Sequence, residues 1–324
     1  MTSMRRCSRK PATTRFMAAA LPWVLLVATP ALEAEPAAAS NAPPAAPQPL
    51  NTLQDDIDRV REQAERGDAE AQYQMAVLYD EGIGVRRNAA EAVKWYRLAV
   101  KQGLVKAQCD LAASLASGDG APRDLAEAAH WYRAAAGRGV AQAQYVLALM
   151  LFTGSGVKPD AAEAAAWFQK AALQGVADAQ YQLALLYADG RGVPRDSVKS
   201  AAWFRSAAEA GHAPAQYELG VVYATGEGVA ASFTDAASWY RKAADQGLAE
   251  AAFNLAFMHS RGQGVPKNDI QAYIWAEKAA ALGSQPATLM ITRLREWMLP
   301  ADIVEAHRLM QEERAKTHPK RVTP

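Results

Sequence analysis

The residues of this 324-residue sequence that could do chemistry are few and scattered. No two histidines have the spacing of a helical metal site such as His-Glu-x-x-His. Only two cysteines occur, Cys7 and Cys109, so no disulfide framework or cysteine-based metal cluster is expected. We therefore predict no catalytic residue, no metal and no cofactor. The histidines are His130, His212, His259, His307 and His318.

Paired glycines recur along the chain and could suggest a phosphate-binding loop. A dinucleotide loop follows a strand, whereas each Gly-x-Gly pair here follows a helical pattern and precedes a helix-capping residue. The pairs are therefore predicted to be turns between helices. They stand at Gly82 and Gly84, Gly118 and Gly120, Gly154 and Gly156, Gly190 and Gly192, Gly226 and Gly228, and Gly262 and Gly264.

These turns belong to a repeat whose period is constant. Tryptophans lie 36 residues apart at Trp95, Trp131, Trp167, Trp203, Trp239 and Trp275. Each repeat contains two helical patterns, which we call helix A and helix B, and opens on a glycine that ends the previous helix. The predicted fold is all-α: an α/α superhelix, or solenoid, of about six helix-turn-helix repeats with terminal capping helices. The repeats are 67–102, 103–138, 139–174, 175–210, 211–246 and 247–282.

Helix B has a clear predicted start. One repeat position holds only good N-cap residues, namely Asn88, Asp124, Asp160, Asp196, Ser232 and Asn268. In four of the six repeats a Glu or Gln follows three residues later, which predicts a capping box. The tryptophans of helix B are predicted to be buried anchors, and Cys109 and His259 to be packed substitutes for aromatic residues.

A polar stripe on helix A is the predicted binding surface. The positions that vary most among repeats are spaced by four, three and four residues, so they share one helix face. Positions that the repeat does not fix are where specificity for a partner can reside. The predicted partner-binding residues are Glu70, Gln74, Glu81, Lys106, Asp110, Gln142, Asp178, Gln182, Asp189, Glu218, Glu250, Asn254 and Arg261.

The charges of this stripe suggest a partner. The stripe contains seven acidic residues and only two basic ones. The outer positions of helix B, in contrast, are rich in Lys and Arg. One hypothesis is an acidic groove that binds a partner segment carrying Lys or Arg. The alternative is that acids near helix starts and bases near helix ends only complement the helix dipoles, since Glu70, Asp178 and Glu250 fall in first turns.

The N-terminal region is typical of an exported protein. Basic residues precede an apolar run from Phe16 to Val27, and small residues follow it. Residues 1–34 are therefore predicted to be a signal peptide, or else an uncleaved membrane anchor. Residues 35–50 form a Pro/Ala-rich linker and 51–66 a capping helix. The protein is expected in the periplasm or secreted, with inner-membrane anchoring as the alternative.

The C-terminal region, 283–324, is predicted to hold a degenerate repeat, a final capping helix and a basic tail. Ile303, Ala306, Leu309 and Met310 share one face of that last helix, which should cover the end of the stack. The net charge of +1 gives no reason to expect nucleic-acid binding.

The repeat resembles the SLR family (Sel-one-like repeats), relatives of tetratricopeptide repeats. The resemblance is carried by Ala179-Gln180-Tyr181 with Leu183-Ala184, by Gly190 to Asp196 and by Ala201 to Ala208, and it covers residues 67–282. It implies a right-handed superhelix that presents a groove to protein partners, as in bacterial adaptors of signalling and envelope biogenesis. Cysteine-rich members resemble penicillin binders, but their cysteine pair in each repeat is missing here.

We therefore expect a non-enzymatic scaffold that binds a protein or peptide in its groove. No nucleic acid or small-molecule substrate is expected, and membrane contact only if the N-terminal segment is retained. A weak cell-wall-directed hydrolase or β-lactamase-like enzyme is the alternative from another class. A structural spacer without a specific ligand is the third.

Overall fold

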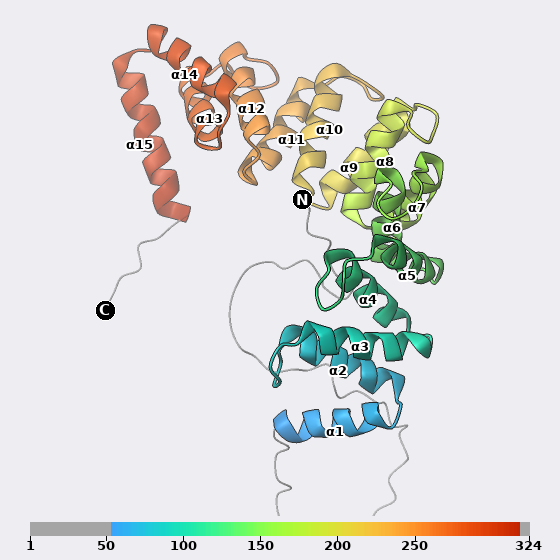
Figure 1. Cartoon of the computed structure of the whole chain (residues 1–324). Coiled ribbons are helices and arrows are strands. Elements are labelled where there is room, and N and C mark those ends of the chain that lie inside the picture. Colours follow the sequence, from blue (N-terminus) through green and yellow to red (C-terminus); the bar gives the residue numbers. More distant parts are fainter. Residues whose placement is uncertain (1–52, 318–324) are drawn as a thin grey trace, which may run out of the picture. The chain divides into compact units, whose positions relative to one another are not determined.

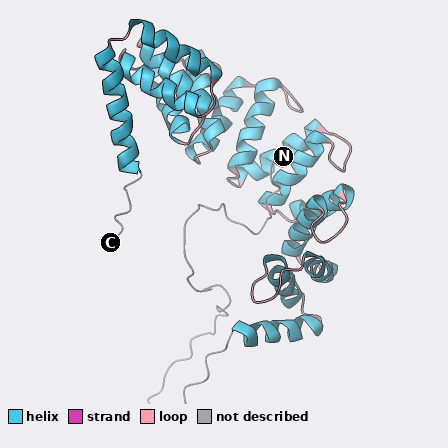
Figure 2. Cartoon of the chain, turned by 60° about the vertical axis from the view of Figure 1, so that its left-hand side comes forward, coloured by secondary structure: helices cyan, strands magenta, loops and turns pink. Residues whose placement is uncertain are grey.

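The computed structural model describes residues 53–317 of the chain, and in this part every regular secondary-structure element is a helix (Figures 1 and 2). The predicted signal peptide and linker lie outside the described residues, as does the end of the basic tail. Within 53–317 no helix is long and apolar enough to cross a membrane.

Helices A and B alternate after an N-terminal capping helix, α1 (Leu53–Glu65). Helices A are α2 (Ala69–Glu81), α4 (Val105–Ser117), α6 (Ala141–Thr153), α8 (Ala177–Asp189), α10 (Ala213–Thr225) and α12 (Ala249–Arg261). Helices B are α3 (Ala89–Lys101), α5 (Leu125–Gly137), α7 (Ala161–Leu173), α9 (Ser197–Glu209), α11 (Phe233–Asp245) and α13 (Asp269–Ala281). The chain ends with α14 (Gln285–Trp297) and α15 (Pro300–Thr317). The all-α repeat fold is thus confirmed.

The described chain forms two compact units. The N-terminal unit holds α1 to α3, α4 as far as Ser114, and residues 119–121; the C-terminal unit holds 115–118 and everything from Pro122 onward. In the N-terminal unit α1 packs on α2 through Ala64, Ala71 and Met75. In the C-terminal unit each helix packs on its neighbours in chain order from α5 to α14, and α15 returns to α13.

The turn between helix A and helix B depends on glycine. Gly192 has a φ of +72°, and a Cβ on it would lie 2.1 Å from the carbonyl oxygen of Ala161, at the start of the previous helix B. Only a residue without a side chain permits this close approach between repeats. Gly175, which opens its repeat with a φ of +83°, has no atom within 4 Å of such a Cβ. The turn glycine Gly192 is therefore required both by its positive φ and by the close contact, whereas Gly175 is required by its positive φ alone.

The predicted N-caps of helix B are confirmed, but the capping box is not. In all six repeats the cap side chain accepts a hydrogen bond from the backbone N–H three residues later. The N–H of the cap itself donates to a carbonyl nine residues earlier on helix A, as in Asp160 to Leu151 at 3.0 Å. That N–H is therefore already bonded, and Glu163 instead accepts from the indole of Trp167 at 3.1 Å.

The tryptophans are not the buried anchors that their spacing suggested. Trp95, Trp131, Trp167, Trp203 and Trp239 are half-buried. The core side chain is the next residue, Tyr96, Tyr132, Phe168, Phe204 or Tyr240, which is at most 5% exposed. Except for Tyr132, whose repeat has Cys109 at that place, this residue meets the helix A aromatic of its own repeat, as Phe204 meets Tyr181 with ring centroids 5.9 Å apart.

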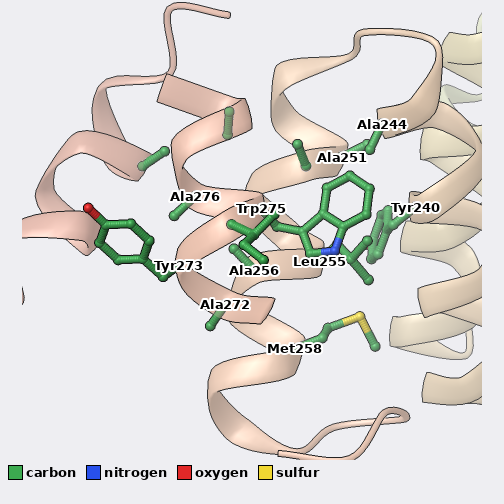
Figure 3. Close-up of a cluster of buried hydrophobic side chains, with 14 of the residues drawn as sticks. Tyr240, Ala244, Ala251, Leu255, Ala256, Met258, Ala272, Tyr273, Trp275 and Ala276 are labelled. Atoms are coloured by element: carbon green, nitrogen blue, oxygen red, sulfur yellow. The ribbon is translucent and has the colours of Figure 1, made fainter. Parts of the chain in front are cut away.

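The sixth repeat is the exception. Ala276 follows Trp275 there, and Trp275 itself is 4% exposed. Figure 3 shows its ring among Tyr240, Ala244, Ala251 and Leu255 in a core cluster of the C-terminal unit. The predicted face of the last helix is confirmed in the same core, since Ala306 is buried and Ile303, Leu309 and Met310 pack against it.

Candidate partner-binding surface

In the N-terminal unit three of the five predicted binding residues, Glu70, Lys106 and Asp110, contact other residues of the same unit. Lys106 donates to the Glu70 carboxylate and lies 4.6 Å from the centroid of the Tyr73 ring. The prediction for Asp110 is wrong: it is 1% exposed and accepts a hydrogen bond from the Tyr73 hydroxyl at 3.0 Å. Gln74 is half-buried and Glu81 is exposed. These three residues of the stripe are therefore already engaged within the fold.

In the C-terminal unit the predicted residues lie on four helices A, namely α6, α8, α10 and α12. Every one of them is accessible to solvent at least in part. Gln142, Asp178, Gln182, Glu218 and Asn254 are half-buried, and Asp189, Glu250 and Arg261 are exposed. Val146 varies among repeats in the same way but is only 2% exposed, so variability alone did not identify surface positions.

Asp178 already has a partner within the fold. Its Oδ1 lies 3.3 Å from Nε2 of His212. Nδ1 of the same imidazole accepts the backbone N–H of Ala215 at 3.1 Å, which caps α10. Since Nδ1 is an acceptor here, Nε2 carries the proton that bonds Asp178. His212 therefore links the start of α10 to the first turn of α8.

Glu218 is the most unusual residue of the stripe. It is half-buried in the middle of α10, and burial raises the pKa of its carboxyl group. Burial, and after it the charge of Glu218, raises the pKa of Tyr181 and of Tyr217. Burial likewise raises the pKa of Tyr240 to about 12.

Glu218 thus lies among tyrosines, and within residues 53–317 it has no ion pair. Asn254 completes this neighbourhood: its side chain partly offsets the rise in pKa of Tyr217 and Tyr240. A carboxylate that is partly desolvated and surrounded by aromatic rings attracts a cation more strongly than one in water does. The arrangement can hold a Lys or Arg side chain.

The helix-dipole alternative explains only part of the acidic stripe. Glu70, Asp178 and Glu250 do lie in first turns, where the dipole favours negative charge. Asp189 is the last residue of α8, where an acid is unfavourable to the dipole, and Glu218 is in mid-helix. These two carboxylates need another explanation.

No catalytic constellation is formed by the described residues. Within 53–317 no group of three His, Cys, Asp or Glu side chains could hold a metal ion. Cys109 is buried, as is His259, whose pKa burial lowers. Ser155 and Lys158 have the Ser-x-x-Lys spacing of a penicillin-binding nucleophile. They lie in the turn after α6, where Ser155 shares a hydrogen bond with Thr153 at 2.8 Å and Lys158 is exposed.

A cleft of 410 Å³ lies away from the stripe, beside α11, α13 and α15. Trp275 and Met310 contribute apolar surface to it, and Lys278 is paired with Glu313 at 2.7 Å on its wall. No stripe residue lines it. Acidic and basic side chains both line this cleft, and two of them already pair with each other. The cleft therefore indicates neither an anionic nor a cationic ligand.

Sequence reasoning missed a glutamine network that connects successive helices. The glutamine of the Ala-Gln motif donates to a carbonyl eight residues earlier, as Gln144 does to Ala136 at 3.2 Å. The glutamine after helix B then donates to that amide oxygen, as in Gln174 to Gln144 at 2.8 Å. Gln102, Gln174 and Gln246 stand 72 residues apart, so only alternate repeats have this second glutamine, and the period did not reveal it.

Comparison with known proteins gives the same repeat. A profile of the Sel1 repeat matches residues 69–104, 105–140, 141–176, 177–212, 213–248 and 249–284. Each matched segment starts two residues after the corresponding opening glycine. Among functionally curated proteins, none matches the chain.

Solved structures agree with the profile. A protective antigen of uropathogenic Escherichia coli with an SLR fold is 33% identical, with a TM-score of 0.72. The match covers 79% of this chain and 56% of the antigen, so this chain spans little more than half of that protein. A Sel1 repeat protein from Oxalobacter formigenes is 30% identical with a TM-score of 0.59, over 70% of this chain and 92% of that one. With six matched repeats on a confirmed helical framework, the chain belongs to the Sel1 repeat family.

Proposed function

We propose that this protein is an exported scaffold that binds a protein or peptide partner along the helix A stripe of its C-terminal unit. Sel1 repeat proteins are generally protein-interaction scaffolds, and the fold is not typically catalytic. The observation that carries the proposal is Glu218, a half-buried carboxylate among tyrosines for which the described chain provides no cation.

The partner segment carries Lys or Arg. A basic side chain beside Glu218 would supply the counter-charge, and Tyr181 and Tyr217 would contact its aliphatic stem. Asp189 on α8 and Glu250 on α12 extend the negative surface to both sides of α10. Gln182 and Asn254 provide hydrogen-bonding groups between them, which favours a peptide over a purely ionic ligand.

Export is proposed from the N-terminal sequence, where basic residues precede a short apolar run. The mature chain then acts in the periplasm or outside the cell, in envelope biogenesis or signalling. Sequencing the N-terminus of the protein recovered from each cell fraction tests this. A mature start between residues 28 and 39 in the exported fraction is expected, and a cytoplasmic full-length chain would refute it.

The binding proposal is tested by crosslinking and pull-down from the native compartment. The single variants Asp189→Lys and Glu218→Lys should each abolish capture of the partner, because the cation of the partner is then repelled. The matched control is Glu209→Lys, an equally large charge change at an exposed position on helix B. Unchanged capture by the stripe variants, or equal loss with the control, would refute the stripe as the binding surface.

A further inference from the structure

The seventh helix A, α14, lacks the helix B that packs on α6, α8, α10 and α12 in the same unit. Its Leu289 occupies the repeat position of Tyr73, Cys109, Tyr145, Tyr181, Tyr217 and Phe253, all of which are buried or half-buried. Its Thr292 occupies the position of six residues that are all buried, Ala76, Ala112, Ala148, Ala184, Gly220 and Ala256. In α14, by contrast, Leu289 is 68% exposed and Thr292 is exposed as well.

The cause is the position of α15. In a full repeat the helix after helix A packs back on it, but α15 packs on α13 instead. Lys278 of α13 pairs with Glu313 of α15 at 2.7 Å, and Ala306 is buried in the core that α13 shares. The side of α14 that a helix B would cover is therefore left open.

The segment that contains this open side has more strongly exposed large apolar side chains than any other part of the described chain. Six large apolar side chains in residues 53–317 are at least 60% exposed, and four of them lie between Leu289 and Val304. These four are Leu289, Trp297, Leu299 and Val304. Such a concentration of exposed apolar area marks an interaction site.

The same face is complementary to itself. Arg293 and Glu296 are exposed on α14, and neither has an ion pair within residues 53–317. If two copies of α14 lie antiparallel with a two-fold axis between residues 294 and 295, Arg293 of each copy faces Glu296 of the other. Thr292 then faces Trp297, and Leu289 faces the segment of Leu299 and Pro300. A two-fold interface requires this kind of reciprocal pairing.

We propose that two copies of this chain associate through the open face of α14, as an antiparallel two-fold pair. Each copy supplies the helix that the seventh repeat of the other lacks. One helix and a short segment per copy place the contact at the small end of protein interfaces, below about 1,200 Å². A contact of this size is expected to give a weak dimer whose population rises with protein concentration.

Sedimentation velocity of the purified protein over rising concentration tests the proposal. The wild type should shift from monomer to dimer. Leu289→Asp should weaken association by at least about tenfold. Because Leu289 is exposed in the monomer, that variant should keep its helical circular dichroism. The matched control is Leu173→Asp, which changes a side chain of 70% exposure on α7 and should leave the dimer intact.

Charge reversal then tests the register. Arg293→Glu and Glu296→Arg should each weaken the dimer, because like charges then face each other across the axis. The double variant restores opposite charges and should recover wild-type association. A wild type that stays monomeric at the highest concentration, equal weakening by Leu173→Asp, or a double variant that fails to recover would each overturn the proposal.

Discussion

The stripe of helix A has different neighbours in the two compact units. In the N-terminal unit Glu70 pairs with Lys106, and Asp110 is buried against Tyr73. In the C-terminal unit Asp189, Glu218 and Glu250 have no ion pair with any described residue. The position shared by Asp110 and Glu218 thus serves the framework in the N-terminal unit, whereas in the C-terminal unit it holds a carboxylate without an ion pair among the described residues.

The difference shows that the repeat position does not decide the role of a stripe residue; the side chains that contact its neighbouring tyrosine do. Asp110 follows Tyr73 by 37 residues and accepts its hydroxyl. Glu218 follows Tyr181 by the same interval, but that ring stacks on His212, with centroids 4.8 Å apart. Substitutions in the framework should therefore act alike in both units, and substitutions in the stripe should not.

The largest effect is expected at the turn glycines. Gly120→Ala in the N-terminal unit and Gly192→Ala in the C-terminal unit should each lower the free energy of unfolding by about 3 kcal/mol. In both, the new Cβ would lie 2.1 Å from a carbonyl oxygen of the preceding helix B. Urea unfolding measures the loss.

Gly103→Ala and Gly175→Ala are the matched controls for the turn glycines. They have similar φ angles but nothing within 4 Å, so each should cost only the backbone strain of about 1 kcal/mol. Equal losses for controls and turn glycines would show that close approach between repeats is not the constraint.

The next effect separates the two units. Asp110→Ala should lower the free energy of unfolding by about 2 kcal/mol, since it leaves the buried hydroxyl of Tyr73 without this acceptor. Glu250→Ala changes an exposed residue and should stay within about 0.5 kcal/mol of wild type. A stable Asp110→Ala variant would mean that the stripe of the N-terminal unit is as dispensable to the fold as that of the C-terminal unit.

A smaller, stabilising effect is expected where the glutamine network is interrupted. Gln102 donates to Gln72 in the N-terminal unit, but Ala210 stands at that place in the fourth repeat. The buried amide oxygen of Gln180 consequently has no donor among the described residues. Ala210→Gln should add about 1 kcal/mol to the free energy of unfolding. Ala210→Leu, which cannot donate, should not reproduce this gain in thermal unfolding.

The smallest effect on stability depends on pH. Glu218 has a raised pKa in the folded state, so between its ordinary value of 4.5 and the raised one the folded chain binds more protons than the unfolded chain. Stability therefore falls as pH rises through this window. Glu218→Gln has no carboxylate to titrate. It should match the wild type below pH 4.5 and exceed it at neutral pH.

Urea unfolding across that pH range measures the difference. If both proteins lose stability equally as the pH rises, Glu218 is not the responsible group. A lysine-rich model peptide extends the test, because its binding should strengthen as Glu218 loses its proton. That pH dependence should be absent from the Glu218→Gln variant.

Much of the framework could be predicted from the sequence because it repeats. The 36-residue period, the N-caps such as Asp160 and the apolar face around Ala306 follow from local preferences that six copies make visible. The choice of core aromatic could not be predicted, since Trp167 and Phe168 are adjacent and helical periodicity alone does not decide which one faces helix A.

The candidate surface was only partly predictable for a similar reason. Variation among repeats located Glu218 and Asp189, but it also included Asp110 and Val146, which are buried. Burial at those positions depends on contacts between successive helices, which one repeat does not contain. The docking of α15 on α13 is likewise set by tertiary contacts such as Lys278 with Glu313.

The glutamine network has a consequence for how such a chain changes length. Each of its bonds joins residues separated by a fixed interval of 8, 30 or 35 positions, and none depends on how many repeats follow. A gene segment of one period that is copied or lost in frame carries donors and acceptors with it. The number of repeats can therefore change in evolution in a single genetic step, and the extent of the partner-facing surface changes with it. The glutamine hydrogen bonds between successive helices need no further substitution.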